Sequence, residues 1–264
     1  MTQRLQILGG GNMGEALLRG LIADGWAKAE ELHVVDPLVS RRTALSVSIP
    51  ELSLSDQPLP RTDAVLAVKP DVVHEVCSVL AQLEVQRVLS IVAGIRISTL
   101  ESRFGDGVRV IRAMPNTPAL IGKGAAAIAA GTIAESGDLN WASSILEAVG
   151  TVVVVDEVLI DSVTGLSGSG PAYLFLLAES LINAGCEAGL PLDISTELTE
   201  QTLLGAATLL ASSNDLPSTL REKVTSKGGT TAAGLAVFEA RGFNEIVRDV
   251  VIAATQRSRE LGSE

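Results

Sequence analysis

The sequence feature that most constrains the fold is a glycine-rich turn near the start of the chain. The segment LQILGGGNMGEALLRGL sets Gly9, Gly11 and Gly14 in a G-x-G-x-x-G pattern, between an apolar strand-like run and a helical pattern. In that setting the first glycine makes a tight turn, the second lets the backbone approach a pyrophosphate, and the third lets helix and strand pack closely. The helix start also offers free amides and a positive dipole. The pattern therefore predicts a dinucleotide-binding turn.

The pattern of secondary structure changes near residue 156. Before this point, β-rich runs such as RLQIL, LHVVD and DAVLAV alternate with helical patterns; after it, the patterns are long, rich in Ala and Leu, and helical. Alternating strands and helices predict a parallel sheet with helices on both faces. We therefore expect an α/β domain with a Rossmann-like, doubly wound parallel sheet over residues 1–160, and an all-α domain over residues 161–264.

The helical half is unusually apolar for a domain of about a hundred residues, a size at which surface should dominate. Hydrophobic residues make up 47% of the chain's 264 residues. The spare apolar faces are expected to pack against another subunit, so the sequence predicts a homo-oligomer.

Charge and cysteine usage exclude several classes of partner. The formal net charge is −11, which argues against nucleic acid or an anionic membrane as the main partner. The most apolar stretch, PAYLFLLAESLINAG, is interrupted by Glu179 and Asn183, so we expect no membrane-spanning segment. Cys77 and Cys186 are isolated, form no metal or disulfide pattern, and fit a reducing cytosol. We therefore expect a cytoplasmic protein without a bound metal.

Asp36, at the end of the second predicted strand, bears on the choice of cofactor. An acid here usually bonds the adenosine ribose and repels a 2′-phosphate, which favours NADH. Ser40, Arg41 and Arg42 follow closely, and arginine suits a phosphate. A solvated helix start explains the arginine pair equally well. The sequence leaves the choice between NADPH and NADH open.

Other predicted strand ends carry further candidate contacts. The third strand ends at Ala67–Pro70 (AVKP) and the fourth at Val92–Gly94 (VAG). The fifth leads to Asn116 and Thr117, a polar pair that is held between two prolines. Doubly wound sheets bind ligands beyond the carboxyl ends of their strands. We therefore expect these strand ends to line a ligand crevice, and the polar pair to contact the nicotinamide or the substrate. An ordinary proline-rich turn is the alternative for that pair.

The segment GLSGSGPAY opens the helical half and has two interpretations. Ser169 and Pro171 are typical of a helix start. Alternatively, Gly168 and Gly170 let the helix end approach the nicotinamide. The residues alone do not decide between them.

The segment VTSKGGTTAAGL, residues 224–235, precedes a helical pattern and predicts a carboxylate-binding site. Its glycines expose amides at a helix start, and its serine and threonines add hydroxyls. A plain N-capped helix is the alternative. His33 lies in a predicted strand and His74 in a predicted helix, so each is expected to be structural. A dehydrogenase without a general acid or base suits a substrate that needs little proton transfer, such as a protonated imine with a nearby carboxylate.

Five segments together resemble the pyrroline-5-carboxylate reductase family: ILGGGNMG, AVKP, IRAMPNTPAL, GLSGSGPAY and LREKVTSKGGTTAAGL. They occur in the family's order over essentially the whole chain, and TSKGGTT is the most specific. Lys227 stands where many members have proline. Asp36 stands where some members have a serine or threonine suited to NADPH.

The resemblance implies that the chain reduces L-1-pyrroline-5-carboxylate to L-proline with NADPH or NADH, by hydride addition to the C=N bond. It implies that the helical domain binds this imino acid and dimerises. The substrate residues would be Ser226, Gly228, Gly229, Thr230 and Thr231, with Thr231 bonding the ring nitrogen. The cofactor residues expected are Gly9, Gly11, Asn12, Met13, Gly14, Asp36, Arg41, Ala67, Val68, Lys69, Pro70, Ala93, Asn116 and Thr117.

Two other functions are compatible with the glycine-rich turn. A β-hydroxyacid dehydrogenase would need a catalytic lysine on the first long helix of the second domain, and GSGPAYLFLLAESLINAG has none. A non-enzymatic nucleotide-sensing module would keep the turn but would have no need of TSKGGTT.

Overall fold

The computed structural model describes residues 3–262, and these form two compact units. Of these, the first unit contains residues 3–169 together with residues 253–262, and the second contains Gly170–Ile252. The sequence predicted ranges of 1–160 and 161–264. Residues 161–169 and 253–262 therefore pack with the sheet-containing unit, which the sequence pattern did not indicate.

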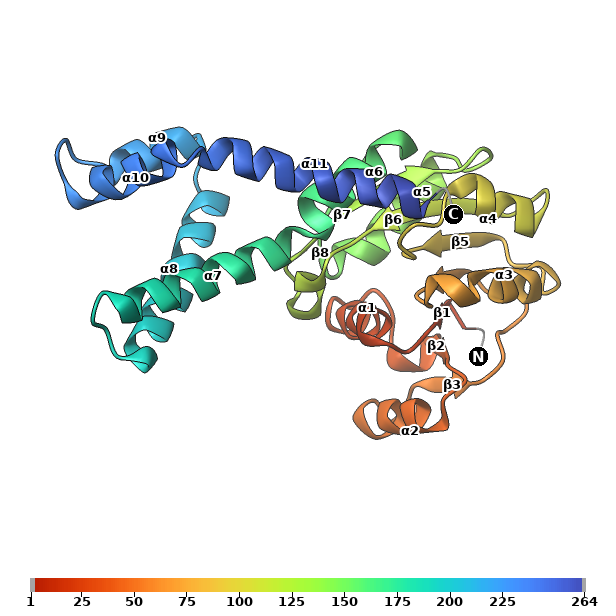
Figure 1. Ribbon diagram of the computed structural model, residues 1–264. Coiled ribbons are helices and arrows are strands. Elements are labelled where there is room, and N and C mark those ends of the chain that lie inside the picture. The colour runs from red at the N-terminus through yellow and green to blue at the C-terminus, as the bar shows by residue number, and fades with distance from the viewer. Residues whose placement is uncertain (1–2, 263–264) are drawn as a thin grey trace. The chain divides into compact units, whose positions relative to one another are not determined.

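The first unit is built on one eight-stranded sheet of order β3-β2-β1-β4-β5-β6-β7-β8 (Figure 1). Its strands are β1 Leu5–Leu8, β2 Leu32–Val35, β3 Ser53–Ser55, β4 Ala64–Leu66, β5 Arg87–Ser90, β6 Arg109–Met114, β7 Gly124–Ala130 and β8 Gly150–Val154. The pairs among β1 to β6 are parallel, whereas β7 runs antiparallel to β6, and β8 runs parallel to β7. The doubly wound parallel sheet is confirmed. Strands β3 and β7, and the reversal at β7, were not predicted.

Helices cover both faces of this sheet. The α-helices of the first unit are α1 Asn12–Ala23, α2 Val39–Ser48, α3 Val73–Ala81, α4 Ile97–Phe104, α5 Ser136–Glu147 and α6 Ile160–Val163. Single 3-10 turns occur at Ala29–Glu31, Pro70–Val72, Thr117–Ile121 and Glu157–Leu159, and a π-helical turn at Thr164–Gly168.

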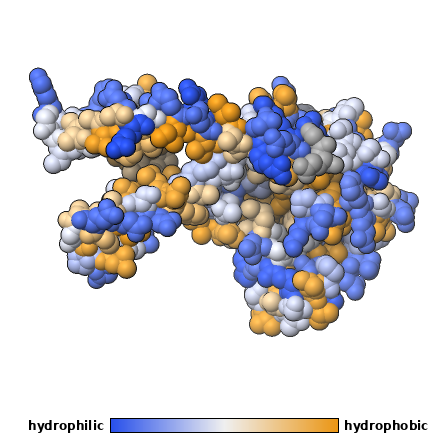
Figure 2. Space-filling model, in the orientation of Figure 1, coloured by the Kyte–Doolittle hydropathy of each residue, from blue (hydrophilic) through white to orange (hydrophobic). Residues whose placement is uncertain are grey.

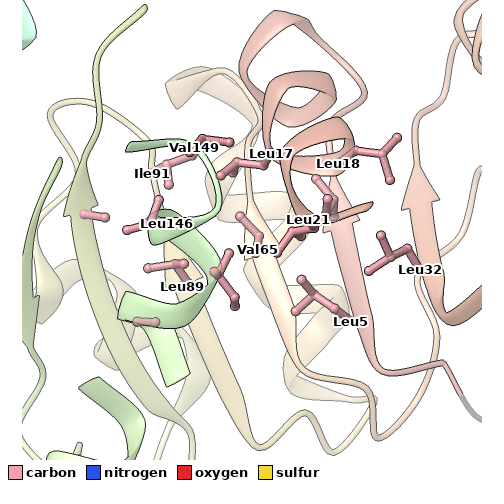
Figure 3. Packing of buried hydrophobic residues seen from close by; sticks show 14 of the residues in the cluster. Leu5, Leu17, Leu18, Leu21, Leu32, Val65, Leu89, Ile91, Leu146 and Val149 are labelled. Atoms are coloured by element: carbon pink, nitrogen blue, oxygen red, sulfur yellow. The ribbon is translucent and has the colours of Figure 1, made fainter. Parts of the chain in front are cut away.

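Strand β1 shows how the alternation of side chains feeds two cores. Leu5 and Ile7 belong to one cluster of buried residues, and Leu8 belongs to the other. In the first cluster, Leu21 of α1 lies near Leu5, and Leu17 lies near Val149 (Figure 3). Helices α3 and α4 contribute to the second cluster. Successive strand residues point to opposite faces, so a helix layer on each side buries both.

The second unit is helical. It contains α7 Gly170–Glu187, α8 Leu192–Ser212, α9 Pro217–Lys223, α10 Thr230–Ala240 and the first part of α11 Phe243–Leu261. Helices α7 and α8 lie side by side (Figure 1), where the Ser195 hydroxyl donates to the Ile182 carbonyl over 2.8 Å. In the described residues of α7 to α10, only Ser195 and Thr199 are buried.

Many large apolar side chains of this helical unit are exposed, and Figure 2 shows hydrophobic patches along its helices. They include Leu174, Phe175, Leu176, Leu204, Val237 and Phe238. A monomeric soluble protein rarely exposes this much contiguous apolar surface, so the unit has the character of a subunit interface. None of the helices in residues 3–262 is both long enough and apolar enough to span a membrane.

Candidate active site

The glycine-rich turn connects β1 to α1 with the geometry that its pattern predicts. Gly9 has a φ of +103°, and a β-carbon there would lie 2.5 Å from the Ala67 carbonyl oxygen. At Gly14 a β-carbon would lie 2.0 Å from the Gly9 carbonyl oxygen, so only glycine lets α1 start this close to the turn. At Gly9 and at Gly14, a side chain is therefore excluded by the protein's own backbone.

Gly11 differs, because the space beside it is open. Apart from its chain neighbours and its own helix, no described heavy atom lies within 4 Å of the position that a β-carbon would take at Gly11. Gly11 caps α1, whose first amides have no carbonyl partner within the helix. Open space in front of free amides and a positive helix dipole fits the pyrophosphate of a dinucleotide.

The carboxylate of Asp36 holds the glycine-rich turn to the end of β2. Its Oδ2 accepts the Gly10 amide and its Oδ1 accepts the Leu38 amide, each over 2.9 Å. Asp36 is only 8% exposed. The predicted cofactor acid therefore also orders the turn, because each carboxylate oxygen already has one backbone donor.

The two arginines after Asp36 are both engaged. Arg41 donates from Nε to the Gly10 carbonyl and from Nη2 to Oε2 of Glu15. Arg42 donates to the Asp36 carbonyl over 2.6 Å. Neither arginine is a freely solvated charge at the start of α2, which was one of the two interpretations of the sequence.

Glu15, which is not among the predicted site residues, bridges two arginines. Its Oε1 pairs with Arg19 at 2.6 Å, and its Oε2 pairs with Arg41. The hydrogen bond from Arg41 is the largest cause that lowers the pKa of the Glu15 carboxyl below 4.5. Glu15 and Arg19 are four residues apart on one helix, so that pair was readable from the sequence. The bond to Arg41 joins residues 26 apart and was not.

The other predicted cofactor segments follow strands that end at one edge of the sheet. Leu8 pairs with Leu66, and Leu66 pairs with Ser90, so β1, β4 and β5 end in line. The segments after these strands hold Gly9–Gly14, Ala67–Pro70 and Ala93. Lys69 and Ala93 are exposed. This alignment is the crevice that doubly wound sheets offer to a ligand.

Asn116 is a buried residue with both ends of its side-chain amide engaged. It donates to the Ser167 carbonyl over 3.0 Å and accepts from the Ala125 amide over 2.9 Å. Asn116 therefore ties the end of β6 to β7 and to the π-helical turn Thr164–Gly168. Thr117 is exposed.

The segment GLSGSGPAY contains a change of helix type, which the sequence did not predict. The π-helical turn ends at Gly168, where a β-carbon would lie 2.6 Å from the Met114 side chain. Gly168 thus packs against the end of β6. Helix α7 begins at Gly170, so Ser169 and Pro171 do lie at a helix start.

In the second unit, the segment TSKGGTT forms an open turn into α10. Gly228 has a φ of +72°, and Gly229 caps the helix, with its amide donating to the Ser226 carbonyl over 3.0 Å. Helix geometry leaves the amides of Thr230 and Thr231 without an intrahelical acceptor. Ser226, Thr230 and Thr231 are exposed. Free amides, hydroxyls and a helix dipole suit a small carboxylate.

The histidines have the surroundings of structural residues. His33 is buried in β2 between the hydroxyls of Ser53 and Ser55, at 2.8 Å from each, and burial lowers its pKa below 6.5. His74 is exposed on α3. Across residues 3–262, no group of three or more His, Cys, Asp or Glu side chains could hold a metal ion.

Two family models match parts of the chain. A family model described as pyrroline-5-carboxylate reductase dimerisation matches residues 157–261, and one described as NADP oxidoreductase, coenzyme F420-dependent, matches residues 4–94. A pyrroline-5-carboxylate reductase of Synechocystis is 44% identical over 266 residues, which cover 99% of each chain. The chain belongs to the pyrroline-5-carboxylate reductase family.

Solved structures support the same family. A pyrroline-5-carboxylate reductase from Coxiella burnetii is 34% identical, with a TM-score of 0.92 and 99% coverage of each chain. A pyrroline carboxylate reductase from Plasmodium falciparum with NADP bound is 31% identical, with a TM-score of 0.86 and 98% coverage of each chain. The predicted family is confirmed, as is an oxidoreductase that uses NAD(P)H. Family membership over the full length removes the β-hydroxyacid dehydrogenase and the sensing module as explanations.

Proposed function

We propose that this chain reduces L-1-pyrroline-5-carboxylate to L-proline, the last step of proline biosynthesis. NAD(P)H supplies the hydride when it is bound. The hydride forms the new C–H bond at the imine carbon, C2 of the pyrroline ring, which becomes C5 of proline. The C=N π-electron pair moves to nitrogen, and the ring nitrogen keeps the proton of the protonated imine. The observation that carries the proposal is the open turn before α10, which offers free amides and hydroxyls in a full-length relative of these reductases.

We assign the substrate carboxylate to the turn into α10. The exposed amides after Gly229 and the dipole of an 11-residue helix favour an anion there. The substrate residues proposed are Ser226, Gly228, Gly229, Thr230 and Thr231.

Thr231 is assigned the hydroxyl that bonds the ring nitrogen. A neutral hydroxyl can accept the N–H of a protonated imine without removing its proton. His33 is held by two serine hydroxyls in β2, so this histidine is not available as a competing acid or base. Catalysis would then come mostly from holding the imine against the hydride donor.

The cofactor is assigned to the carboxyl edge of the sheet in the first unit. The residues proposed to bind it are Gly9, Gly11, Asn12, Met13, Gly14, Asp36, Arg41, Ala67, Val68, Lys69, Pro70, Ala93, Asn116 and Thr117. The open space at Gly11 supports the pyrophosphate position. Asn116 is assigned to the site through the backbone that it positions, because its side-chain amide is engaged at both ends.

We also propose that residues 1–160 form the dinucleotide-binding domain and that residues 161–264 bind the substrate and dimerise. The exposed apolar residues of α7 to α10 support a homo-oligomer through the helical domain.

A cytoplasmic location is supported by two free cysteines, Cys77 and Cys186. The net charge of −11 speaks against nucleic acid as a partner.

Isotope transfer tests the proposed reaction. The enzyme is given L-1-pyrroline-5-carboxylate and a reduced nicotinamide cofactor with deuterium at the transferred position, and the product is analysed by mass spectrometry. We expect L-proline with one deuterium at C5. Proline without deuterium, or no proline at all from folded enzyme, would contradict the proposal.

A further inference from the structure

A carboxylate on α1 lies beside the arginine that follows the proposed ribose-binding acid. Glu15 pairs with Arg41, and the side chains of both are about a quarter exposed, at 24% and 27%. Arg41 is also fixed to the Gly10 carbonyl through its Nε. The guanidinium therefore has a set position, and a negative charge is in contact with it.

Arg41 and Asp36 flank the same residue of the glycine-rich turn. A β-carbon at Gly10 would lie 3.2 Å from Oδ2 of Asp36 and 3.4 Å from Cγ of Arg41. An adenosine ribose bound at Asp36 would thus present its 2′-oxygen close to Arg41 as well. A 2′-phosphate at that position would meet both side chains.

The charges around this position oppose one another. Arg41 and Arg42 would attract a 2′-phosphate, whereas Asp36 and Glu15 would repel it. Arg19 pairs with the far oxygen of Glu15 and donates to the Ser48 hydroxyl over 3.0 Å, so it is directed away from Arg41. The acid in contact with Arg41 therefore decides how much of its charge is available to a phosphate.

Donor geometry allows Arg41 to serve a phosphate without leaving the turn. A guanidinium has five N–H donors, and the bonds to Gly10 and Glu15 use two of them. Removing the charge of Glu15 would leave Arg41 bonded to the Gly10 carbonyl. The positive charge of Arg41 would then be available to a phosphate. A neutral side chain of the same shape should thus favour a phosphorylated ribose.

We propose that Glu15 is a positioning residue for Arg41 and a determinant of cofactor selectivity, which weakens the binding of a 2′-phosphorylated adenosine relative to the unphosphorylated one. The inference rests on the cofactor site proposed above. It adds a residue outside the predicted set, acting on Arg41 from a different helix.

Two small nucleotides test this directly, without nicotinamide and without turnover. Binding of 2′,5′-ADP and of 5′-AMP is measured by calorimetry for the wild-type enzyme and for Glu15→Gln. We expect Glu15→Gln to bind 2′,5′-ADP about three- to tenfold more tightly and 5′-AMP within about twofold of wild type. A purely structural role for Glu15 would move both affinities together.

One control variant tests the effect of net charge, and a second tests whether Glu15 acts through Arg41. Glu75→Gln makes the same change in net charge in the first turn of α3 and should leave the ratio of the two affinities unchanged. In the double variant Glu15→Gln/Arg41→Gln, the gain in 2′,5′-ADP affinity should disappear.

Three results would overturn the inference. One is an equal change in both affinities for Glu15→Gln, and another is weaker binding of 2′,5′-ADP. The third is failure of either nucleotide to bind the folded wild-type enzyme, which would also overturn the cofactor site itself. Unchanged affinities for both nucleotides count as the first of these results, which would leave the cofactor site standing and remove only Glu15.

Discussion

The carboxylate of Asp36 accepts the backbone amide of Gly10 over 2.9 Å, so the predicted ribose acid is also a brace for the glycine-rich turn. This bond links the end of β2 to the turn after β1. A change at Asp36 should therefore affect stability as well as cofactor choice.

Asp36→Ser should shift cofactor preference toward NADPH and weaken the fold. The shorter side chain removes a negative charge and leaves the buried Gly10 amide without its acceptor, which should cost about 1–3 kcal/mol in the free energy of unfolding. Chemical denaturation measures the stability, and kcat/KM for NADPH and NADH measures the preference. If both the stability and the ratio stayed at wild-type values, Asp36 would have neither role.

Gly11 and Gly14 should respond differently to alanine. Gly14→Ala forces a β-carbon to within 2.0 Å of the Gly9 carbonyl oxygen and should lower the free energy of unfolding by about 2–4 kcal/mol. The β-carbon of Gly11→Ala would lie in open space, so the free energy of unfolding should change by less than about 0.5 kcal/mol. Cofactor binding should nevertheless weaken about tenfold or more. Unimpaired cofactor binding by Gly11→Ala would argue against a pyrophosphate at this place.

Thr231→Ala should lose about 1.5–3 kcal/mol of transition-state stabilisation if its hydroxyl bonds the charged imine. Steady-state kinetics on the folded variant measures this loss. Thr208→Ala on α8 is the matched control, because that hydroxyl bonds the Leu204 carbonyl of its own helix. Wild-type turnover in Thr231→Ala would remove Thr231 from the mechanism.

The buried His33 should make the fold sensitive to mild acid. Burial is the main cause that lowers its pKa below the ordinary 6.5, so the unfolded chain takes up a proton at a higher pH than the folded one. Stability that is present above about pH 6.5 should fall as the pH drops through that value, and should level off below the folded-state pKa. Denaturation between about pH 8 and 5 measures the slope.

His33→Gln should flatten this slope, whereas His74→Gln, on an exposed residue, should retain it. A wild-type slope in His33→Gln would assign the acid sensitivity to other groups.

Phe175→Glu should weaken the assembly. Phe175 on α7 is 68% exposed, and a charge there would be buried without a partner in an apolar subunit interface. Sedimentation velocity should show a shift toward monomer. Val47→Glu on α2 is the control, since Val47 is 77% exposed in the sheet-containing unit and should leave the assembly intact. An unchanged assembly in Phe175→Glu would argue against α7 as part of the interface.

The sequence could predict the parts of this fold that depend on local patterns. Spacing and periodicity predict the turn at Gly9–Gly14, the acid at Asp36 and the change to helices near residue 156. Strand β7 was missed because GAAAIAA has a single β-branched residue, Ile128, and no aromatic residue, and both types are typical of strands. Its pairing between β6 and β8 is set by tertiary contacts.

The motifs of the candidate site could be predicted from the sequence, whereas the contacts between its side chains could not. The segment TSKGGTT and the strand ends could be found by residue type. The bond between Glu15 and Arg41, and the two hydrogen bonds of the Asn116 amide, join residues that only the folded chain brings together. The same holds for residues 253–262, which return to the first unit.

The most direct test is the loss of reduced-nicotinamide absorbance when the enzyme meets L-1-pyrroline-5-carboxylate, run in parallel with NADPH and NADH. We expect oxidation of the cofactor that depends on the substrate, with L-proline formed in equal amount. No oxidation with either cofactor, from enzyme shown to be folded, would contradict it.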